Sequence, residues 1–374
     1  MKDTWFAIGA GSIGRTVIGP LAEDAGLDLV FGIGTTRHDA AVVEKRVETF
    51  AGQPEYTVRI AAPRNHCEKR KVRVSGIINL SDEAALFALI TSPQLKVIST
   101  SVRFDGLEGV AAALAPFVAA RCDSLLILPF ENIEQNGDYF RACLEAARVN
   151  VSHLLTPNVI VDCMVSQSED PLIIPMRERY LELLASTSGD PLWDEWMQSV
   201  LRMHIVWDSV TEYRRKIIGV SAVNSGIAWL GSELGLQYLH QAVGARALYE
   251  PIRVFIKEIE AALVRLTRAP ARAVQTYLET TLLRVENEYL LDETARFYRN
   301  LAFKLGPGER FSFAAQLAME GGVFPETILR IMAIGVKRLA AESGHDPEKI
   351  VKDICRFPPG MKGLETFLVH EAWR

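Results

Sequence analysis

A glycine-rich turn near the start of the chain constrains the fold more than any other feature. It reads GAGSIG over 9–14 and lies between an apolar run at 5–8 and a helix-like stretch at 15–25. In a strand–turn–helix unit, glycines at this spacing permit a tight turn, let a pyrophosphate approach the backbone, and let the helix pack on the strand. The helix N-terminus adds a positive dipole. The pattern predicts a dinucleotide site, and the alternative is a turn that binds no ligand; the predicted contacts are Gly9, Gly11, Ser12, Ile13 and Gly14.

The end of the next predicted strand, at 27–33, indicates which dinucleotide binds. Sites that prefer NAD usually carry a carboxylate there, to accept hydrogen bonds from the ribose hydroxyls. Here the chain continues with Thr35, Thr36 and Arg37, while Asp28 comes too early and Asp39 too late. Hydroxyls and a guanidinium suit a 2′-phosphate. We therefore predict NADP as cofactor; the alternative is that Arg37 is solvated and the site accepts NAD as well.

Strand-like and helix-like segments alternate through the first half of the chain. We expect strands at 4–8, 27–33, 95–101 and 124–129, and a hairpin made of 56–61 and 71–78. Such alternation is typical of a parallel sheet with crossover helices. The sequence therefore predicts an α/β Rossmann-like nucleotide-binding domain over 1–190.

The second half of the chain changes character. From about Trp193 onward, apolar residues recur at three- and four-residue steps, for example over 206–231 and 289–300. This spacing predicts amphipathic helices. We expect an all-helical domain for substrate binding and catalysis over 191–374, after a boundary in the Gly, Pro, Ser and Asp-rich stretch 186–193.

Charge and cysteine content exclude several classes of protein. The net charge is -5 and the sequence pI is about 5.9, which argues against a nucleic-acid partner, and the basic stretch 64–73 is interpreted as a solvated hairpin edge. Five cysteines without a CxxC pair are typical of a reduced compartment, and the isolated pair His66-Cys67 predicts no metal site. With no signal peptide and no long apolar run, we expect a cytoplasmic protein without membrane contact, a monomer or small homo-oligomer.

Six short segments carry a resemblance to a known family. They read GAGSIGR at 9–15, VSG at 74–76, ENIEQNG at 131–137, PNVIVD at 157–162, RVEN at 284–287 and KLGPG at 304–308. In order and spacing they resemble the mannitol dehydrogenase family of long-chain polyol dehydrogenases, most closely its shorter mannitol-1-phosphate 5-dehydrogenase branch. The resemblance implies an NAD(P)-dependent oxidoreductase that interconverts a secondary alcohol and a ketone of a polyol or sugar phosphate. The alternatives are a specialised dehydrogenase for another pathway intermediate and a catalytically idle nucleotide-binding protein.

The resemblance also assigns a catalytic helix. In that family a helix carries a lysine as general base, an asparagine five residues on and a histidine three beyond, and here these positions hold Lys216, Ser221 and Asn224. The lysine is kept, while a hydroxyl and a carboxamide replace the other two groups. At about 100° per residue the three positions fall within roughly 140° of one helix face. The alternative is that Lys216 continues the basic run of Arg214 and Arg215 on a solvated face.

Two glycines interrupt the same predicted helix. Gly219 and Gly226 each cost on the order of 1 kcal/mol relative to alanine. Small residues kept at that cost often mark the close approach of another group. We expect a ligand or another backbone to approach the helix there.

Further candidate site residues follow strands or match the family's substrate side. Asn132 comes after the apolar strand 125–129, at the sheet edge where ligands bind, and is assigned by resemblance to the substrate oxygen or the nicotinamide; the alternative is an Asx turn. Asp162 ends another apolar run and either orients Lys216 or caps the next segment. The resemblance further implies that Arg284, Arg296 and Lys304 lie on the substrate side, and Arg296 and Lys304 are favoured for substrate contact. Arg284 and Asn287 could equally form a buried structural pair that links helices.

Overall fold

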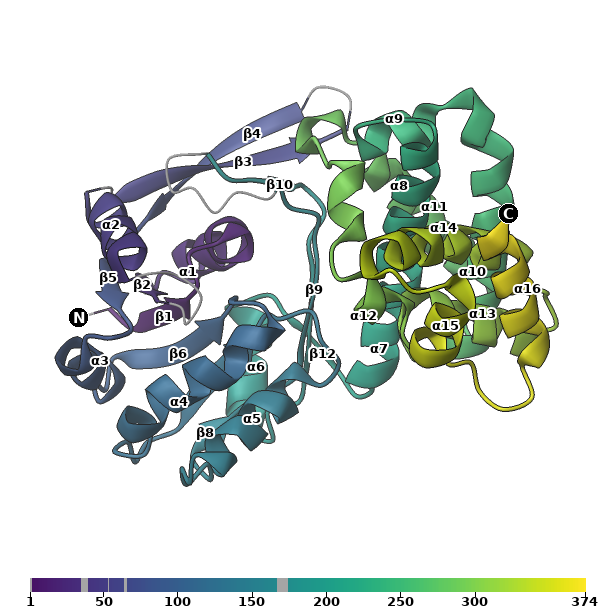
Figure 1. Cartoon of the computed structure of the whole chain (residues 1–374). Helices are drawn as coiled ribbons and strands as arrows, with labels where there is room; N and C mark the ends of the chain where they lie inside the picture. The colour runs from purple at the N-terminus through teal and green to yellow at the C-terminus, as the bar shows by residue number, and fades with distance from the viewer. Residues whose placement is uncertain (1, 35–39, 53, 64–65, 167–173) are drawn as a thin grey trace. The chain divides into compact units, whose positions relative to one another are not determined.

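The chain forms two compact units, Met1–Val210 and Thr211–Arg374. The structure, a computed structural model, describes residues 2–34, 40–52, 54–63, 66–166 and 174–374 (Figure 1). The first unit extends past the boundary at 190/191 expected from the sequence. It does so because β12 (His204–Val206) pairs with β11 (Glu182–Ser186), and because α6 (Pro191–Ser199) buries Met197 in the core of this unit.

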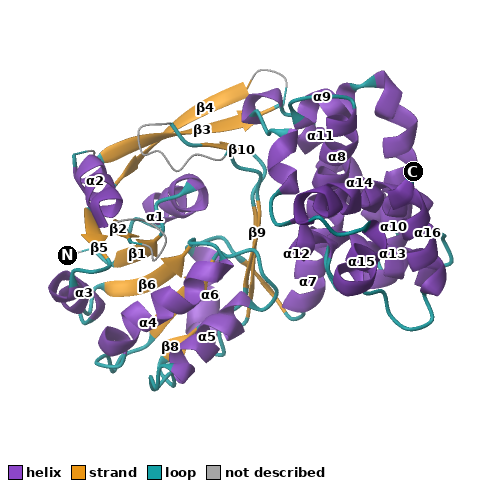
Figure 2. Ribbon diagram, viewed as in Figure 1, coloured by secondary structure: helices purple, strands orange, loops and turns teal. Residues whose placement is uncertain are grey.

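A six-stranded parallel sheet forms the centre of the first unit (Figure 2). The strand order β5-β2-β1-β6-β7-β8 is that of doubly wound dinucleotide folds, which confirms the predicted Rossmann-like class. Strands β2 and β5 lie on one side of β1, and β6, β7 and β8 lie on the other, so the strand order switches at β1. Ligands bind open α/β sheets at such a switch point. The strands, in sheet order, are Gly76–Asn79, Asp28–Ile33, Thr4–Ile8, Leu95–Thr100, Leu125–Pro129 and Leu154–Leu155.

Both faces of this sheet are buried. Within β1, Trp5 and Ala7 belong to one hydrophobic cluster and Phe6 and Ile8 to the other, as the alternation of side chains along a strand requires. A strand that is apolar on both faces is typical of parallel sheets covered by helices on each side. The helices of the unit, besides α6, are η1 (Gly14–Ile18), α1 (Gly19–Asp24), α2 (Ala40–Ala51), α3 (Glu83–Ile90), η2 (Phe104–Gly106), α4 (Leu107–Val118) and α5 (Asn136–Ala146).

The predicted hairpin exists, but its second strand was placed wrongly. Strand β3 (Glu55–Ala62) pairs antiparallel with β4 (His66–Arg73), and β10 (Met176–Glu178) adds a third, parallel strand. The stretch predicted as one strand, 71–78, contains the end of β4 and the start of β5. The chain leaves the hairpin because the N–H of Ser75 donates to the carbonyl of Leu29 at 2.7 Å and so joins the central sheet beside β2. A further small sheet combines β11 and β12 with β9 (Val159–Asp162).

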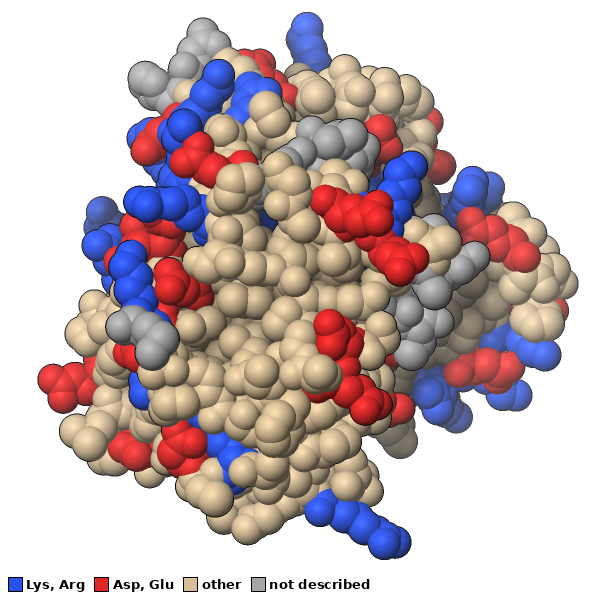
Figure 3. Space-filling model, turned by 90° about the vertical axis from the view of Figure 1, so that its left-hand side faces the viewer, with Lys and Arg blue, Asp and Glu red and all other residues tan. Residues whose placement is uncertain are grey.

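Basic side chains of the hairpin pair with nearby carboxylates. Arg70 approaches Asp24 at 2.6 Å, Lys71 approaches Glu55 at 2.6 Å, and Arg73 approaches Glu23 at 3.7 Å. In the view of Figure 3, acidic and basic groups are likewise interspersed at the surface. Nearby carboxylates therefore compensate the positive charge of these three residues in the basic stretch.

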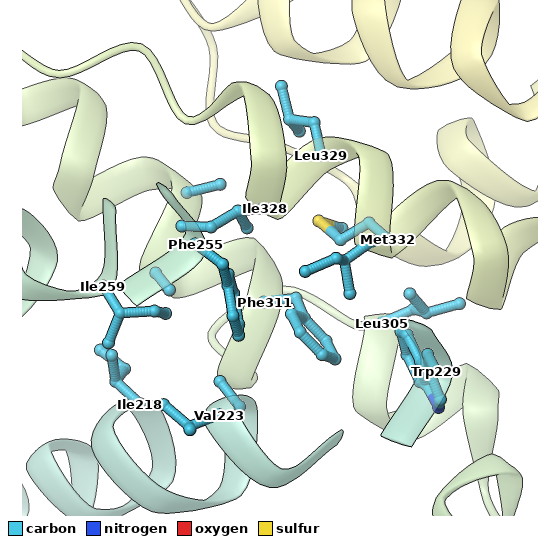
Figure 4. Close-up of a cluster of buried hydrophobic side chains, with 14 of the residues drawn as sticks. Ile218, Val223, Trp229, Phe255, Ile259, Leu305, Phe311, Ile328, Leu329 and Met332 are labelled. Carbon is cyan, nitrogen blue, oxygen red and sulfur yellow. The ribbon is translucent and has the colours of Figure 1, made fainter. Parts of the chain in front are cut away.

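The second unit consists of helices around one core. Most of its buried side chains are aliphatic, with an aromatic group among them: Trp229 stacks on Tyr298 at 5.8 Å and on Phe311 at 4.7 Å between ring centroids, and Phe255 lies nearby (Figure 4). Across the part of the chain that the structure describes, no helix is both long and apolar enough to cross a membrane. The helical elements are α7 (Ser209–Lys216), η3 (Ile217–Ala222), α8 (Val223–Glu233), α9 (Leu239–Gly244), η4 (Arg246–Leu248), α10 (Tyr249–Thr267), α11 (Ala271–Val285), η5 (Glu288–Leu290), η6 (Thr294–Tyr298), α12 (Leu301–Leu305), α13 (Arg310–Glu320), α14 (Glu326–Ser343), α15 (Pro347–Ile350), η7 (Val351–Cys355) and α16 (Lys362–Trp373).

The predicted helix over 289–300 is wrong. The segment forms two short 3₁₀ turns, η5 and η6, separated at Leu291, whose φ of +46° interrupts a helix. Backbone groups that a helix would use internally instead bind the segment before α9. The N–H of Thr294 donates to Gln237 at 2.9 Å, and the carbonyl of Asp292 accepts from Leu239 at 2.8 Å.

Candidate functional site

The glycine-rich turn is shaped by two very close backbone approaches. Gly9 has φ +102°, and a Cβ there would lie 2.7 Å from the carbonyl oxygen of Ser101. A Cβ at Gly14 would lie 2.0 Å from the carbonyl oxygen of Gly9. At Gly11 a Cβ would meet no atom within 4 Å, so this side of the turn is open. A turn that is packed at its first and third glycines and open at its second fits a pyrophosphate.

The helix that follows starts with a π-helical turn, η1. The N–H of Arg15 donates to the carbonyl of Gly11 at 3.0 Å, so the turn at Ser12 and Ile13 leads directly into it. Isolated π-helical turns are frequent at functional sites. Thr35, Thr36 and Arg37, on which the expected choice of NADP rests, lie outside the described residues, so that choice stays a prediction.

Loops after β6 and β7 meet beside the glycine-rich turn. The hydroxyl of Ser101 donates to the carbonyl of Gly9 at 2.9 Å. Next along the chain, the N–H of Val102 donates to the carboxylate of Glu131 at 2.9 Å. Burial raises the pKa of Glu131, and the Thr100 hydroxyl donates to it at 2.7 Å. Asn132 follows as an exposed side chain, so the structure brings it to the edge of the sheet that carries the turn.

Asn136 was not selected as a site residue, although it fixes this loop. Its side-chain Nδ2 donates to the carbonyls of Pro129, Glu131 and Val159 at 2.8, 2.9 and 2.8 Å. Its Oδ1 accepts from the N–H of Val159 at 2.8 Å. The contacts bring the ENIEQNG and PNVIVD segments together. The available sequence signal was the position of Asn136 in the ENIEQNG segment. Asp162, the last residue of β9, is 1% exposed.

The helix of the second unit that carries the predicted catalytic residues contains a π-helical turn. Lys216 ends α7, the turn η3 covers 217–222, and Asn224 lies at the start of α8. Hydrogen bonds in a π-helix link residues five apart, so Ser221 is the neighbour of Lys216 one turn on. Asn224, three residues further, is on the same side. The three side chains therefore gather on a narrower face than a regular α-helix would give them.

The glycines of this helix accommodate aromatic rings. A Cβ at Gly219 would lie 2.3 Å from the Tyr277 ring, and one at Gly226 would lie 2.6 Å from the Phe255 ring. The expected approach of a ligand or backbone is wrong at both positions, because side chains of neighbouring helices occupy the space. The ring of Tyr277 also carries the Arg215 guanidinium 4.6 Å above its centroid.

Arg296 and Lys304, the two predicted substrate contacts, lie near each other in the second unit. Lys304 is half-buried, and its ammonium donates to the carbonyl of Phe297 at 2.7 Å. Burial, together with Arg310, Arg296 and Arg299, lowers the pKa of Lys304 to about 7. We call Arg296, Arg299, Lys304 and Arg310 the cationic cluster. Two of its arginines pair with carboxylates, Arg296 with Asp292 and Arg310 with Glu309.

Sequence reasoning missed two members of this cluster, Arg299 and Arg310. Arg310 is 8% exposed and lies at the start of α13, with one guanidinium nitrogen 3.5 Å from the hydroxyl of Ser225. Ser225 directly follows Asn224, so the cluster adjoins the helix that carries Lys216. Arg284 and Asn287 are 5% and 3% exposed, so both side chains are buried.

A doubly wound sheet with a glycine-rich turn at its switch point defines the class: Rossmann-fold proteins with a turn of the dinucleotide-binding type. The sequence profile of the mannitol dehydrogenase Rossmann domain matches residues 5–192, about half of the chain. The chain belongs to the mannitol dehydrogenase family, as its motifs predicted. Membership makes it an NAD(P)-dependent oxidoreductase that acts on CH–OH groups.

Curated relatives confirm the predicted branch. Mannitol-1-phosphate 5-dehydrogenase from Bacillus velezensis is 27% identical over 370 residues, covering 93% of this chain and 94% of the relative. The enzyme of that name from Bacillus subtilis is 25% identical over 367 residues, again covering 93% of this chain and 94% of the relative.

Solved structures share the fold over the whole chain. Mannitol 2-dehydrogenase of Pseudomonas fluorescens, determined as a ternary complex with NAD and D-mannitol, has a TM-score of 0.79 at 15% identity and covers 100% of this chain and 92% of its own. A D-sorbitol dehydrogenase has a TM-score of 0.77 at 14% identity, covering 100% of this chain and 93% of its own.

Proposed function

We propose that this chain oxidises a secondary hydroxyl of a polyol phosphate to a ketone, and reduces the ketose phosphate in the reverse direction, with NADP(H) preferred over NAD(H). Its relatives bear the name mannitol-1-phosphate 5-dehydrogenase. Oxidation of mannitol 1-phosphate at C5 gives fructose 6-phosphate, so these two compounds are the substrate pair to test first. The enzyme works in the cytoplasm as a monomer or small homo-oligomer.

The proposal that the substrate carries a phosphate rests on the hydrogen-bond partner of Lys304. Its ammonium is held by a neutral carbonyl, that of Phe297, at 2.7 Å. Beside it, Arg296 pairs with Asp292 and Arg310 with Glu309. The positive charge of Lys304 is therefore available to an anionic group of the substrate, and Arg296 supports it with a planar donor group suited to phosphate.

The chemical step is assigned to the helix of the second unit. NAD(P) supplies hydride transfer when bound. Lys216 accepts the proton of the reacting hydroxyl during oxidation and returns it during reduction. Ser221 and Asn224 hydrogen-bond the reacting oxygen and hold Lys216. The amide N–H of Asn132 donates a hydrogen bond to the substrate oxygen or the nicotinamide. Asp162 contributes to substrate binding.

Cofactor choice is assigned to the residues after β2. Thr35, Thr36 and Arg37 bind the 2′-phosphate, since no carboxylate between Asp28 and Asp39 repels it. Titration of the purified protein should give a lower Kd for NADPH than for NADH. Arg37→Ala should raise the Kd of NADPH while leaving that of NADH nearly unchanged. Equal affinities in the unmutated protein would overturn the preference.

A substrate panel tests the function as a whole. The protein is assayed by nicotinamide absorbance with mannitol 1-phosphate, fructose 6-phosphate, mannitol and fructose. We expect a KM for the phosphorylated pair that is lower by about tenfold or more, the scale of one charge-assisted contact. Equal KM values for both pairs contradict the phosphate assignment. The replacements at Ser221 and Asn224 favour a second candidate, a dehydrogenase of another hydroxy compound. NADPH binding without turnover of any panel member would support either this second candidate or a catalytically idle protein.

A further inference from the structure

A proline interrupts the hydrogen-bond series in the first helix of the cofactor-binding unit. Hydrogen bonds in the π-helical turn η1 link residues five apart, and the N–H of Gly19 donates to the carbonyl of Gly14 in this way. The next bond of the series would run from residue 20 to the carbonyl of Arg15. Residue 20 is proline, which has no N–H. Pro20 therefore cannot donate to the carbonyl of Arg15.

The hydroxyl of Tyr56 donates to the carbonyl of Arg15 at 2.8 Å. Tyr56 belongs to β3, so the bond joins the β3–β4 hairpin to the first turn of the cofactor helix. Burial raises the pKa of Tyr56 above its ordinary value, so the phenol keeps its proton and remains a donor.

Neighbouring residues fix the position of this hydroxyl. A Cβ at Gly19 would lie 2.0 Å from the Tyr56 oxygen, so glycine makes room for the contact. Phe31 of β2 packs against the tyrosine ring, with 6.3 Å between ring centroids. The sequence thus provides the space, the packing surface and the acceptor for one hydroxyl group.

A second contact from the hairpin secures the same helix further along. Arg70 of β4 donates to the carbonyl of Pro20 at 2.9 Å and to both carboxylate oxygens of Asp24 at 2.9 and 2.6 Å. Helix α1 is also in contact with β4. A bidentate arginine–carboxylate pair fixes geometry as well as charge. The hairpin therefore holds the helix at two successive places.

We propose that Tyr56 is a positioning residue for the dinucleotide: by donating to the carbonyl of Arg15 it keeps the π-helical turn in place, and with it the backbone N–H groups that receive the pyrophosphate. The inference rests on the proposed binding of NAD(P) to the glycine-rich turn. Without the hydroxyl, the N–H of Gly19 is the donor that an α-helical bond would direct to Arg15. That exchange converts the π turn into an α turn and moves the glycine-rich turn relative to the helix.

Tyr56→Phe removes the hydroxyl and keeps the ring. We expect the Kd of NADPH to rise about tenfold, the scale of one lost buried hydrogen bond. The KM of the cofactor should rise with it, while kcat and the KM of the polyol substrate stay nearly constant. Tyr139→Phe is the matched control, because it removes a hydroxyl that donates to Glu108 at 2.8 Å between α4 and α5. The control should leave the Kd of NADPH unchanged.

A second variant tests the cause of the effect. Pro20→Ala restores an N–H at residue 20, which can then serve the carbonyl of Arg15. In that background, Tyr56→Phe should raise the Kd of NADPH by no more than about twofold, so the two changes are coupled. An equal loss in both backgrounds overturns the proposal.

The remaining outcomes separate this inference from the proposed function. Reduced thermal stability of Tyr56→Phe with unchanged NADPH affinity makes Tyr56 a purely structural residue and overturns the inference alone. Failure of the unmutated protein to bind either dinucleotide overturns both the cofactor assignment and the inference. The inference is supported if the Kd of NADPH rises in Tyr56→Phe, stays unchanged in Tyr139→Phe, and is restored in the Pro20→Ala background.

Discussion

The ammonium of Lys304 lies 2.7 Å from the carbonyl oxygen of Phe297, the residue that follows Arg296. This bond anchors a lysine among arginines whose charges, together with burial, lower its pKa to about 7. A backbone carbonyl orients the ammonium without neutralising it. Lys304 is therefore a charged group whose protonation changes within the working range of an enzyme.

The pH dependence of substrate binding should report this lysine. Below pH about 7 Lys304 is protonated and binds an anionic substrate, and as pH rises through about 7 it loses its charge. The KM for mannitol 1-phosphate should rise over this range, whereas the KM for mannitol should change little. Lys304→Arg, which stays charged, should remove the rise. A flat KM from pH about 6 to 9 in the unmutated protein contradicts the prediction.

The same shift affects folding stability in a definite direction. The pKa of Lys304 is lower in the folded protein than its ordinary value of 10.5. Between these values the unfolded chain binds more protons, so the contribution of this residue to the free energy of unfolding increases with pH. Denaturant melts of the unmutated protein and of Lys304→Met, compared at pH about 7 and 9, measure it. Parallel pH profiles of the two proteins would exclude the shift.

Replacement of Lys216 should separate catalysis from binding. Lys216→Ala should lower kcat by about a hundredfold to ten-thousandfold, the usual contribution of a general base. The Kd of NADPH should stay nearly unchanged, because the lysine acts on the proton of the substrate. Steady-state kinetics and cofactor titration together check this. Retention of most of kcat would remove Lys216 from the mechanism.

The replaced positions of the catalytic helix should influence substrate choice. Asn224 can hold Lys216 but does not titrate near neutrality as a histidine would, and Ser221 is shorter than an asparagine. The double variant Ser221→Asn with Asn224→His should raise kcat/KM for mannitol or fructose above that of the unmutated protein. Its pH–rate profile should gain a histidine limb. A folded, NADPH-binding double variant without any gain would show that other residues set substrate choice.

Asn136 should be a strong determinant of stability in the first unit. Asn136→Ala removes three donated bonds and one accepted bond and leaves buried carbonyls without this donor, at a cost of about 3 kcal/mol in the free energy of unfolding. The matched control is Asn150→Ala, where the lost contact is one turn bond from Ser152 at 3.1 Å. Equal destabilisation by the two changes, in denaturant titrations, would contradict the assigned role.

Local pattern predicted four strands of the central sheet, β1, β2, β6 and β7, and most helices, but not the contacts between segments distant in the chain. The expected strand 4–8 coincides with Thr4–Ile8, since an apolar run before a glycine-rich turn has few other uses. Strand β5 was merged with the hairpin strand before it, because its pairing with β2 joins segments that are distant in the sequence. The helix over 289–300 failed because its backbone binds the segment before α9, which no local spacing reports.

Sequence motifs predicted some residues of the candidate site, but they did not predict the features that depend on contacts between helices. Lys304 and Arg296 came from the family resemblance, whereas the lowered pKa of Lys304 depends on burial and on Arg310, which lies in another helix. The π-helical turns at 14–18 and 217–222 were not predicted. One extra residue in a turn leaves apolar spacing on either side intact, so periodicity does not reveal it.

The turn at 217–222 also bears on how such a helix can evolve. A π-helical turn is what a single-codon insertion leaves behind when both flanking segments stay helical. Removal of one residue there would restore a regular α-helix in which the present Asn224 stands seven positions after Lys216, within about 20° of it around the axis. The gene can therefore lose one codon at this turn while the reactive face keeps its direction, whereas a loss in the α-helical part beyond it would rotate all that follows by about 100°.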